Sequence, residues 1–201
     1  MLTLTRLILA VLTLVAIGQQ LILHVAASYS VLNFFSYFTN LSNIFAALIL
    51  LLSVFLNRSS SQELAKYAST VNMVVVGLVF AILLRNVDLG ALLPWVNFVL
   101  HYLMPVAVVL NWLAAPPATK LRPKHMLITL VFPTAYLVYV LVRGASTGWY
   151  PYPFLNPANV GGYGAVAAYS LGITATFLIA SWALLVIGNR LGSSKRHNAS
   201  A

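Results

Sequence analysis

The sequence predicts an all-α, polytopic membrane protein built as a single bundle of six transmembrane helices. Hydrophobic side chains make up 61% of the 201 residues and charged side chains only 6%, whereas about a quarter of the residues of a soluble domain are charged. The chain also contains six long apolar runs, and about 20 apolar residues suffice to cross the hydrocarbon core. This composition excludes an ordinary soluble domain and also a disordered chain, which needs few apolar groups.

The six apolar runs are separated by short loops with polar, proline or glycine residues, and we find no repeat or second domain. We expect spans at about 7–27, 36–56, 68–86, 94–113, 126–142 and 164–188. The remaining residues, 189–201, form a polar tail that we expect to be mobile and cytoplasmic. Arg6 and the small residues at 25–27 also fit a cleavable signal peptide, but the apolar run is long for one.

Lysine and arginine are distributed unevenly between the two sides of this predicted bundle. One side holds Arg6, Arg58, Lys66, Lys120, Arg122, Lys124, Arg190, Lys195 and Arg196. The other side holds only Arg85 and Arg143. Because cytoplasmic loops carry the excess of positive charge, we expect both termini in the cytoplasm, at the inner membrane if the cell is bacterial. The net charge of +9 then reflects topology, and we expect no nucleic-acid partner.

The residue inventory limits the chemistry that the chain can perform. It has no cysteine and two carboxylates, Glu63 and Asp88. Disulfides, thiolate metal sites and cysteine nucleophiles are therefore excluded, and paired-carboxylate catalysis is disfavoured. We expect no metal and no cofactor. A haem held between His24 and His101 is a less favoured alternative, because further histidines at helical spacing are missing.

Polar residues form a stripe at the start of the second span. Ser36, Thr39, Ser42 and Asn43 are spaced i, i+3, i+6 and i+7 and share one helical face, which the small residues at 46 and 47 continue. Lipid would not solvate such a stripe, so we expect it to face the inside of the bundle.

The fourth span carries a histidine at a similar depth. His101 lies six residues after Trp95, which fits the outer aromatic belt, and therefore roughly 9 Å deeper. Asn97 lies one turn before His101 and could orient the imidazole. Pro105 removes the helical hydrogen bond to the His101 carbonyl, so we expect a kink there.

One half of the bundle thus gathers most of the chemically capable side chains. A threonine becomes a useful nucleophile when an imidazole takes its proton, so Thr39 and His101 are our candidate catalytic pair. Asn43 and Asn97 could orient these groups or stabilise an oxyanion, and Arg85 and Arg143 could bind an anionic head group. The alternatives stay open: Thr39 could bond to its own helix, His101 could join two helices, and the arginines could only cap helix ends.

The segment 148–157 combines aromatic residues with three prolines, and it predicts a rigid loop at the membrane interface. Such a loop could act as a lid over the polar half of the bundle or simply anchor the protein in the interface.

Two short motifs carry a resemblance to a known family. Tyr37-Phe38-Thr39, which opens the second span, and Trp95-x-Asn97-x-x-x-His101, which opens the fourth, resemble the androgen-induced and androgen-dependent TFPI-regulating protein family. The chain looks like a prokaryotic-type relative. The resemblance implies a six-span threonine hydrolase for fatty acid esters of hydroxy fatty acids, with Thr39 as nucleophile and His101 as essential histidine.

The resemblance is not complete, and this leaves the substrate open. The family pattern places an asparagine three residues after the threonine, where this chain has Ser42, with Asn43 one position later. We therefore expect an intramembrane lipid ester hydrolase that takes its substrate from the bilayer. The alternative is a non-enzymatic lipid-binding or small transport protein that uses the same polar pocket.

Overall fold

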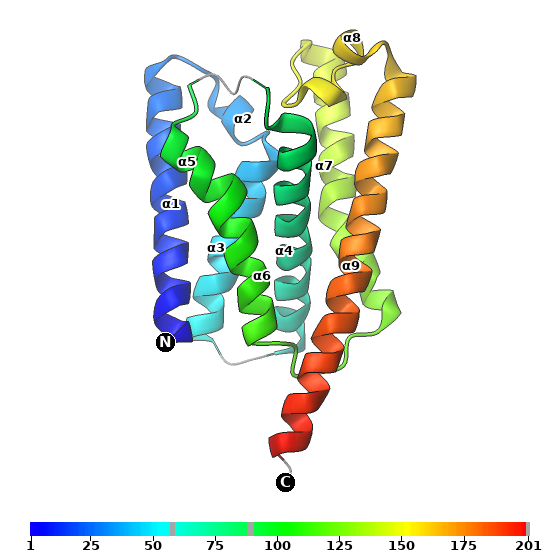
Figure 1. Cartoon of the computed structure of the whole chain (residues 1–201). Coiled ribbons are helices and arrows are strands. Elements are labelled where there is room, and N and C mark those ends of the chain that lie inside the picture. Colours follow the sequence, from blue (N-terminus) through cyan, green and yellow to red (C-terminus); the bar gives the residue numbers. More distant parts are fainter. Residues whose placement is uncertain (57–58, 88–90, 200–201) are drawn as a thin grey trace.

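The computed structural model describes residues 1–56, 59–87 and 91–199. Six of its helices are long and apolar enough to cross a membrane, and they pack side by side in one bundle (Figure 1). These spans are Leu2–Ala26, Phe38–Phe55, Ser60–Leu84, Pro94–Ala114, Pro123–Thr147 and Tyr163–Ser194. The predicted all-α, six-helix membrane fold is therefore confirmed, and the chain is an integral, multi-pass membrane protein.

Two of the six spans contain a π-helical segment. The first, second, fifth and sixth spans are formed by α1 (Leu2–Ala26), α3 (Phe38–Phe55), α7 (Met126–Thr147) and α9 (Tyr163–Ala199). The third continues from α4 (Ser60–Val79) into a π-helical segment, η1 (Phe80–Leu84). The fourth runs through α5 (Pro94–Phe98), the π-helical η2 (Val99–Leu103) and α6 (Met104–Ala114). Four short helical turns complete the described structure: α2 (Val31–Phe34), η3 (Pro123–His125), η4 (Pro153–Leu155) and α8 (Pro157–Val160).

The two ends of the bundle differ in construction. The N-terminus and the C-terminal part of α9 lie at the same end, which we call the terminal end (Figure 1). The opposite end carries α2, the start of α5 and the 148–162 connection that contains α8, and we call it the loop end. Arg58, one of the predicted cytoplasmic cations, and Asp88, one of the two carboxylates, lie outside the described residues.

Several helix boundaries differ from those that the apolar runs predict. The third span begins at Ser60 and not near 68, because Ser59 and Gln62 form a capping box in which each side chain accepts a hydrogen bond from the other residue's backbone N–H. The fifth span ends at Thr147 and not near 142, because Gly148 adopts a left-handed backbone conformation (φ 72°) that terminates the helix. Hydropathy alone could not locate either boundary.

The predicted polar tail after 188 is also helical, up to Ala199. Asn189 accounts for the continuation, since its side-chain amide donates to the Leu121 carbonyl at 2.8 Å and accepts from the Leu121 N–H at 2.8 Å. These two hydrogen bonds fasten α9 to the connection between α6 and α7. The described part of the tail is therefore a continuation of α9, and its mobility stays a prediction.

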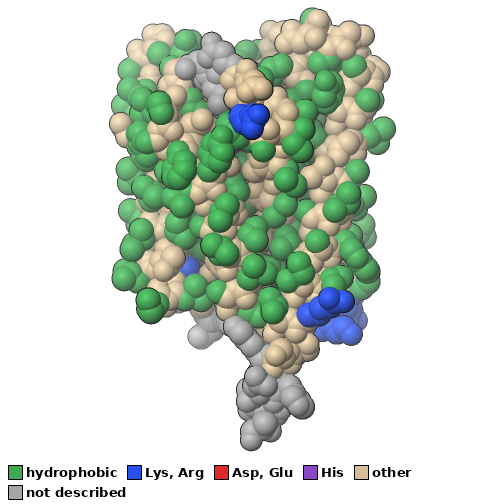
Figure 2. All heavy atoms as spheres, viewed as in Figure 1, with side chains coloured by type: hydrophobic (Ala, Val, Ile, Leu, Met, Phe, Trp, Pro, Cys, Tyr) green, Lys and Arg blue, Asp and Glu red, His purple; other side chains and the backbone are tan. Residues whose placement is uncertain are grey.

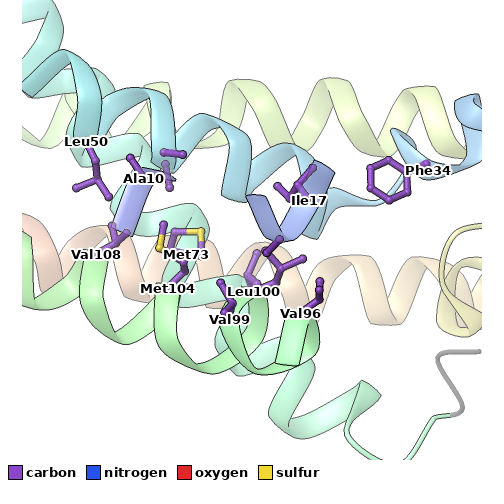
Figure 3. Packing of buried hydrophobic residues seen from close by; sticks show 14 residues of the cluster. Ala10, Ile17, Phe34, Leu50, Met73, Val96, Val99, Leu100, Met104 and Val108 are labelled. Carbon is purple, nitrogen blue, oxygen red and sulfur yellow. The ribbon is translucent and has the colours of Figure 1, made fainter. Parts of the chain in front are cut away.

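The largest hydrophobic cluster lies where α1, α3, α4 and the fourth span meet (Figure 3). Small residues in α1 and α3, Ala10, Ala46 and Ala47, are at most 1% exposed and let the helices approach closely. A second cluster surrounds Trp112 in α6, and a third lies towards the loop end around Phe80. The third cluster matters most for the site, because it holds aromatic residues of the 148–157 segment.

The lateral surface is apolar. Figure 2 shows hydrophobic side chains covering the middle of one face, with the Lys and Arg side chains visible there lying nearer to its two ends. Exposed large side chains include Ile82, Val131, Leu171 and Ile179, which are 62–75% accessible in the isolated chain. An apolar surface of this kind fits a protein that lipid surrounds.

Candidate functional site

The polar stripe of the second span is buried, as its spacing predicts. Thr39 is 7% exposed, and Ser36, Ser42 and Asn43 are fully buried. The helix begins at Phe38, so Ser36 precedes it and has a different task. Its carbonyl accepts a hydrogen bond from the Tyr136 hydroxyl at 2.8 Å and thereby ties the start of α3 to α7.

The nearest polar partner of Thr39 is a tyrosine from the loop end. The backbone N–H of Thr39 donates to the Tyr152 hydroxyl at 3.2 Å, and Thr39 Oγ1 lies 3.4 Å from the same oxygen. Thr39 belongs to the first turn of α3, whose N–H groups have no partner within the helix. The Tyr152 hydroxyl therefore caps this helix and touches the candidate nucleophile.

Aromatic packing holds Tyr152 in this position. Its ring stacks on Phe154 with centroids 5.2 Å apart, and Tyr37 meets it edge-on at 5.8 Å. Desolvation by burial raises the pKa of the Tyr152 phenol above its ordinary value, so the hydroxyl stays protonated at neutral pH. The sequence predicted a loop here but did not single out Tyr152, because its contact with Thr39 spans 113 residues.

His101 sits in the π-helical segment η2. Its ring stacks on Phe80 of η1, with centroids 4.1 Å apart and an interplanar angle of 24°. Its Nδ1 lies 3.3 Å from the Asn97 backbone carbonyl. Because a carbonyl only accepts, Nδ1 must carry the proton, and Nε2 of the neutral ring carries the lone pair. His101 thus presents the form that a general base requires.

The predicted role of Asn97 needs a correction. Its backbone carbonyl, and not its side chain, orients the imidazole of His101. The side-chain Oδ1 of Asn97 is buried and has no hydrogen-bond partner among the described residues. The i, i+4 spacing therefore found the right pair of residues and the wrong atom.

Pro105 affects the helix in a way that the sequence predicted only in part. Instead of a simple kink, the chain forms η2, in which the Met104 N–H donates to the Val99 carbonyl five residues earlier. In this pattern the Leu100 carbonyl would pair with Pro105, which has no N–H. Asn43 supplies the missing donor, with Nδ2 at 3.2 Å from the Leu100 oxygen.

Asn43 links the two candidate catalytic residues through their backbones. Its Nδ2 also donates to the Thr39 carbonyl at 2.9 Å, so one amide group holds both Thr39 and the residue before His101. Both amide hydrogens are used in this way. Asn43 is therefore placed to position the pair, and it has no hydrogen left to donate to an oxyanion.

Thr39 and His101 open into the same cavity at the loop end, which we call the vestibule. It has a volume of about 460 Å³, and its walls come from α1, the 29–40 segment, both π-helical spans and the 149–159 segment. Side-chain amides are prominent in its lining: Gln20, Asn33, Asn40, Asn156 and Asn159. Within the described part of the chain, no hydrogen bond joins Thr39 to His101.

A second, apolar cavity lies beside the vestibule. It has a volume of about 100 Å³ and is bounded mainly by apolar side chains of α4, α7 and α9, such as Val75, Leu137 and Phe177. Thr39 and Tyr152 line both cavities. The candidate nucleophile thus stands at the boundary between a polar and an apolar space.

The two arginines do not enter either cavity lining. Arg143 donates through Nη2 to Asn33 Oδ1 at 2.5 Å, and its guanidinium lies 4.8 Å from the centre of the Trp149 ring. Asn33 and Trp149 do line the vestibule, so Arg143 supports its wall from behind. Arg85 follows η1, and its side chain is exposed.

Two further vestibule residues are fixed by backbone groups. Gln20 donates to the Ala91 carbonyl at 3.0 Å and accepts from the Leu93 N–H at 3.1 Å, which clamps the start of α5 to α1. His24 Nε2 lies 2.9 Å from the Ser30 carbonyl. No pattern in the sequence pointed to Gln20. No group of three or more His, Cys, Asp or Glu gathers among the residues that the structure describes.

Comparisons with family models, curated proteins and solved structures found no match to this chain. The function is therefore argued from the site itself, and the family resemblance of the two motifs stays a prediction.

Proposed function

We propose that the protein is an intramembrane lipid ester hydrolase with Thr39 as nucleophile and His101 as general base. One observation carries the proposal: Thr39 lies at the boundary of a polar vestibule and an apolar cavity, and His101 opens into the same vestibule. An ester substrate is divided in the same way: its acyl chain is apolar, whereas its alcohol half is polar and is the side from which water must arrive. The positive-inside distribution supports an orientation with the loop end at the outer face of the cell membrane and both termini in the cytoplasm.

The substrate enters from the bilayer, and its acyl chain occupies the apolar cavity. The carbonyl carbon then lies next to Thr39, and the alcohol half extends into the vestibule. Buried aromatic and aliphatic side chains around the apolar cavity exclude water from the chain. The vestibule supplies the water that the second half of the reaction consumes.

The chemistry follows from the tautomer of His101. Nε2 takes the proton of the Thr39 hydroxyl, and Oγ1 attacks the carbonyl carbon. When the C–O bond to the alcohol breaks, the proton passes from Nε2 to the leaving oxygen. Water then gives a proton to Nε2 and attacks the acyl-threonine; the acid leaves, and the proton returns to Thr39. Hydrogen bonds of this type are often long without substrate and shorten in the reacting complex.

Tyr152 is the nearest donor for the negative charge that develops on the carbonyl oxygen. Its oxygen accepts the Thr39 N–H, so its own proton is available to Thr39 Oγ1 or to the oxyanion. Removal of one oxyanion donor typically lowers kcat by about 10²–10³-fold. The resemblance of the Tyr37-Phe38-Thr39 and Trp95-x-Asn97-x-x-x-His101 motifs to a family of threonine hydrolases supports the same assignment.

The proposal is tested with detergent-purified protein, a fluorophosphonate probe and hydrolysis of a long-chain lipid ester. We expect Thr39→Ala and His101→Ala to abolish labelling and turnover. Ser42→Ala is the matched control, because Ser42 is fully buried on the same face of α3 but lines neither cavity. Full ester turnover by Thr39→Ala would show that the mechanism is wrong.

A non-enzymatic lipid-binding or transport protein is the second candidate, and one observation favours it. The hydroxyl of Thr39 is paired with Tyr152 and not with His101. Such a protein would bind lipid equally well as wild type, Thr39→Ser and Thr39→Ala. It would also show no probe labelling in any of the three.

A further inference from the structure

Three vestibule side chains have their orientation fixed by backbone carbonyls. Asn40 donates through Nδ2 to the Phe34 carbonyl at 2.9 Å. His24 and His101 each direct one ring nitrogen at a carbonyl, Ser30 through Nε2 and Asn97 through Nδ1. Since a carbonyl only accepts, each of these contacting nitrogens must carry a hydrogen.

The opposite atom of Asn40, and of each imidazole in its neutral form, is therefore a hydrogen-bond acceptor. Asn40 retains its Oδ1, His24 its Nδ1 and His101 its Nε2, and none of these three atoms has a hydrogen-bond partner among the described residues. All three residues line the vestibule. The cavity thus presents three lone pairs from three different helices or loops.

Donors are also present, but they are uncharged: side-chain amides and the hydroxyls of tyrosines such as Tyr37 and Tyr152. Asn33 and Asn156 each use Oδ1 as an acceptor, from Arg143 and from the Ala158 N–H, which leaves their NH₂ groups for a ligand. The positive charge nearest to this wall, Arg143, is already engaged with Asn33 and Trp149. A ligand here must therefore donate as well as accept hydrogen bonds, and it finds no cation in the described lining.

We propose that the vestibule binds the uncharged, hydroxyl-bearing head group of a single-chain lipid, such as the glycerol of a monoacylglycerol-type ester. A hydroxyl can donate to the three acceptors and accept from the two amides. A carboxylate or phosphate only accepts, so it would meet lone pairs and lose its hydration without a countercharge. The identification of this head group as the alcohol half of a substrate rests on the proposed function, whereas the binding preference does not.

The test uses two non-hydrolysable ligands that share one chain: 1-O-dodecylglycerol and dodecyloxyacetate. Binding of each radiolabelled ligand is measured at neutral pH on the full-length protein in nanodiscs, with empty nanodiscs subtracted. We expect the glycerol ether to bind at least about ten-fold more tightly, which is the effect of roughly one good hydrogen bond. Equal or tighter binding of the carboxylate, or no binding of either ligand, overturns the inference.

Two variants locate the preference in the vestibule. His24→Lys places a cation in the lining, and we expect it to reduce or invert the preference for the glycerol ether. Ala145→Lys adds the same charge at an exposed position of the loop end outside the vestibule, and we expect no change. An unchanged preference in His24→Lys also overturns the inference.

Hydrolysis separates this inference from the proposed function. The ester 1-dodecanoylglycerol is offered to the same protein, with Thr39→Ala as the control. Preferential binding of the glycerol ether without Thr39-dependent hydrolysis would refute the hydrolase and leave the head-group assignment intact. Thr39-dependent hydrolysis together with a preference for the carboxylate would support the hydrolase and refute the head-group assignment.

Discussion

At the scale of single residues, Asn43 connects the two halves of the candidate site. Its amide donates to the carbonyls of Thr39 and Leu100. The Leu100 carbonyl needs this donor because its partner in the π-helical pattern would be Pro105, which has no N–H. Without the Asn43 side chain, the buried Leu100 carbonyl would lack this hydrogen bond, whereas the Thr39 carbonyl would keep the helical hydrogen bond from the N–H four residues later. The residue therefore serves both the stability of the bundle and the position of His101.

We expect Asn43→Leu to lower the stability by about 1–3 kcal/mol, because the Leu100 carbonyl is left unpaired, and to slow fluorophosphonate labelling of Thr39. Thermal unfolding in detergent and the labelling rate are the measurements. Asn72→Leu is the matched control, because Asn72 is also buried in a span but its amide has no hydrogen-bond partner among the described residues. If Asn43→Leu and Asn72→Leu behave alike, Asn43 does not have the coupling role that we assign to it.

Tyr152 gives a second prediction at this scale. Tyr152→Phe keeps the ring that stacks on Phe154 and removes the hydroxyl that touches Thr39. We expect kcat to fall by about 10²-fold with a small change in KM, because an oxyanion donor acts mainly in the transition state. Tyr37→Phe, which alters a neighbouring ring in the vestibule lining, should leave kcat near wild type. A Tyr152→Phe variant that changes only KM would contradict the role in the reaction.

The sequence singled out Thr39 and His101 as candidates, but it could not predict the contacts around them. Spacing within one helix shows that Thr39, Ser42 and Asn43 share a face, and the structure buries that face, with Ser36 buried just before the helix begins. It cannot show that residue 152 returns to residue 39, because that contact depends on how a distant loop packs. The contact of Asn97 with His101 is local, but i, i+4 spacing does not distinguish a backbone contact from a side-chain contact.

At the scale of elements, the 148–157 segment depends on a close approach to α7. Gly144 is buried in α7, and a Cβ at this position would overlap the ring of Tyr150. A glycine is therefore required here so that the segment can lie against the helix and carry Tyr152 to Thr39. The packing of one loop thus depends on a position without a side chain.

Gly144→Ala should displace Tyr150 and lower stability by about 1–3 kcal/mol, as overpacking usually does. Probe labelling of Thr39 should fall with it, because the same segment carries Tyr152. Gly164→Ala is the control at the same end of the bundle, since a Cβ there meets nothing within 4 Å. Thermal unfolding and labelling of the two variants, side by side, distinguish a steric effect from a general glycine effect. Equal behaviour would refute the packing argument.

Helix number was predictable from apolar composition, but helix ends were not. A span needs only enough apolar residues, and six such runs are visible in the sequence. Ends depend on local hydrogen bonds, such as the capping box of Ser59 and Gln62 or the pairing of Asn189 with Leu121. Polar residues supply these hydrogen bonds, and a prediction from hydropathy assigns such residues to loops or tails.

At the scale of the whole molecule, the charge asymmetry predicts how the bundle sits in the membrane. The chain contains no cysteine, so single cysteines can report on each side without background. Ser146 at the loop end and Ser61 near the terminal end are both exposed. We expect a membrane-impermeant maleimide to label Ser146→Cys in intact cells and Ser61→Cys only after permeabilisation. The opposite pattern would invert the topology and the side from which water reaches the vestibule.

The two π-helical segments have a consequence for the helical phase of their spans. Each holds one residue more than an α-helix of the same rise, so the part of the helix beyond it is turned by about 100° relative to an uninterrupted helix. Deletion of one residue within η2 (Val99–Leu103) would restore the regular repeat. It would also rotate the Pro94–Phe98 turn away from Gln20, which holds the backbone at Ala91 and Leu93. The extra residue of η2 thus sets the helical phase of the fourth span, so that the buried faces of α5 and α6 both point to the interior of the bundle.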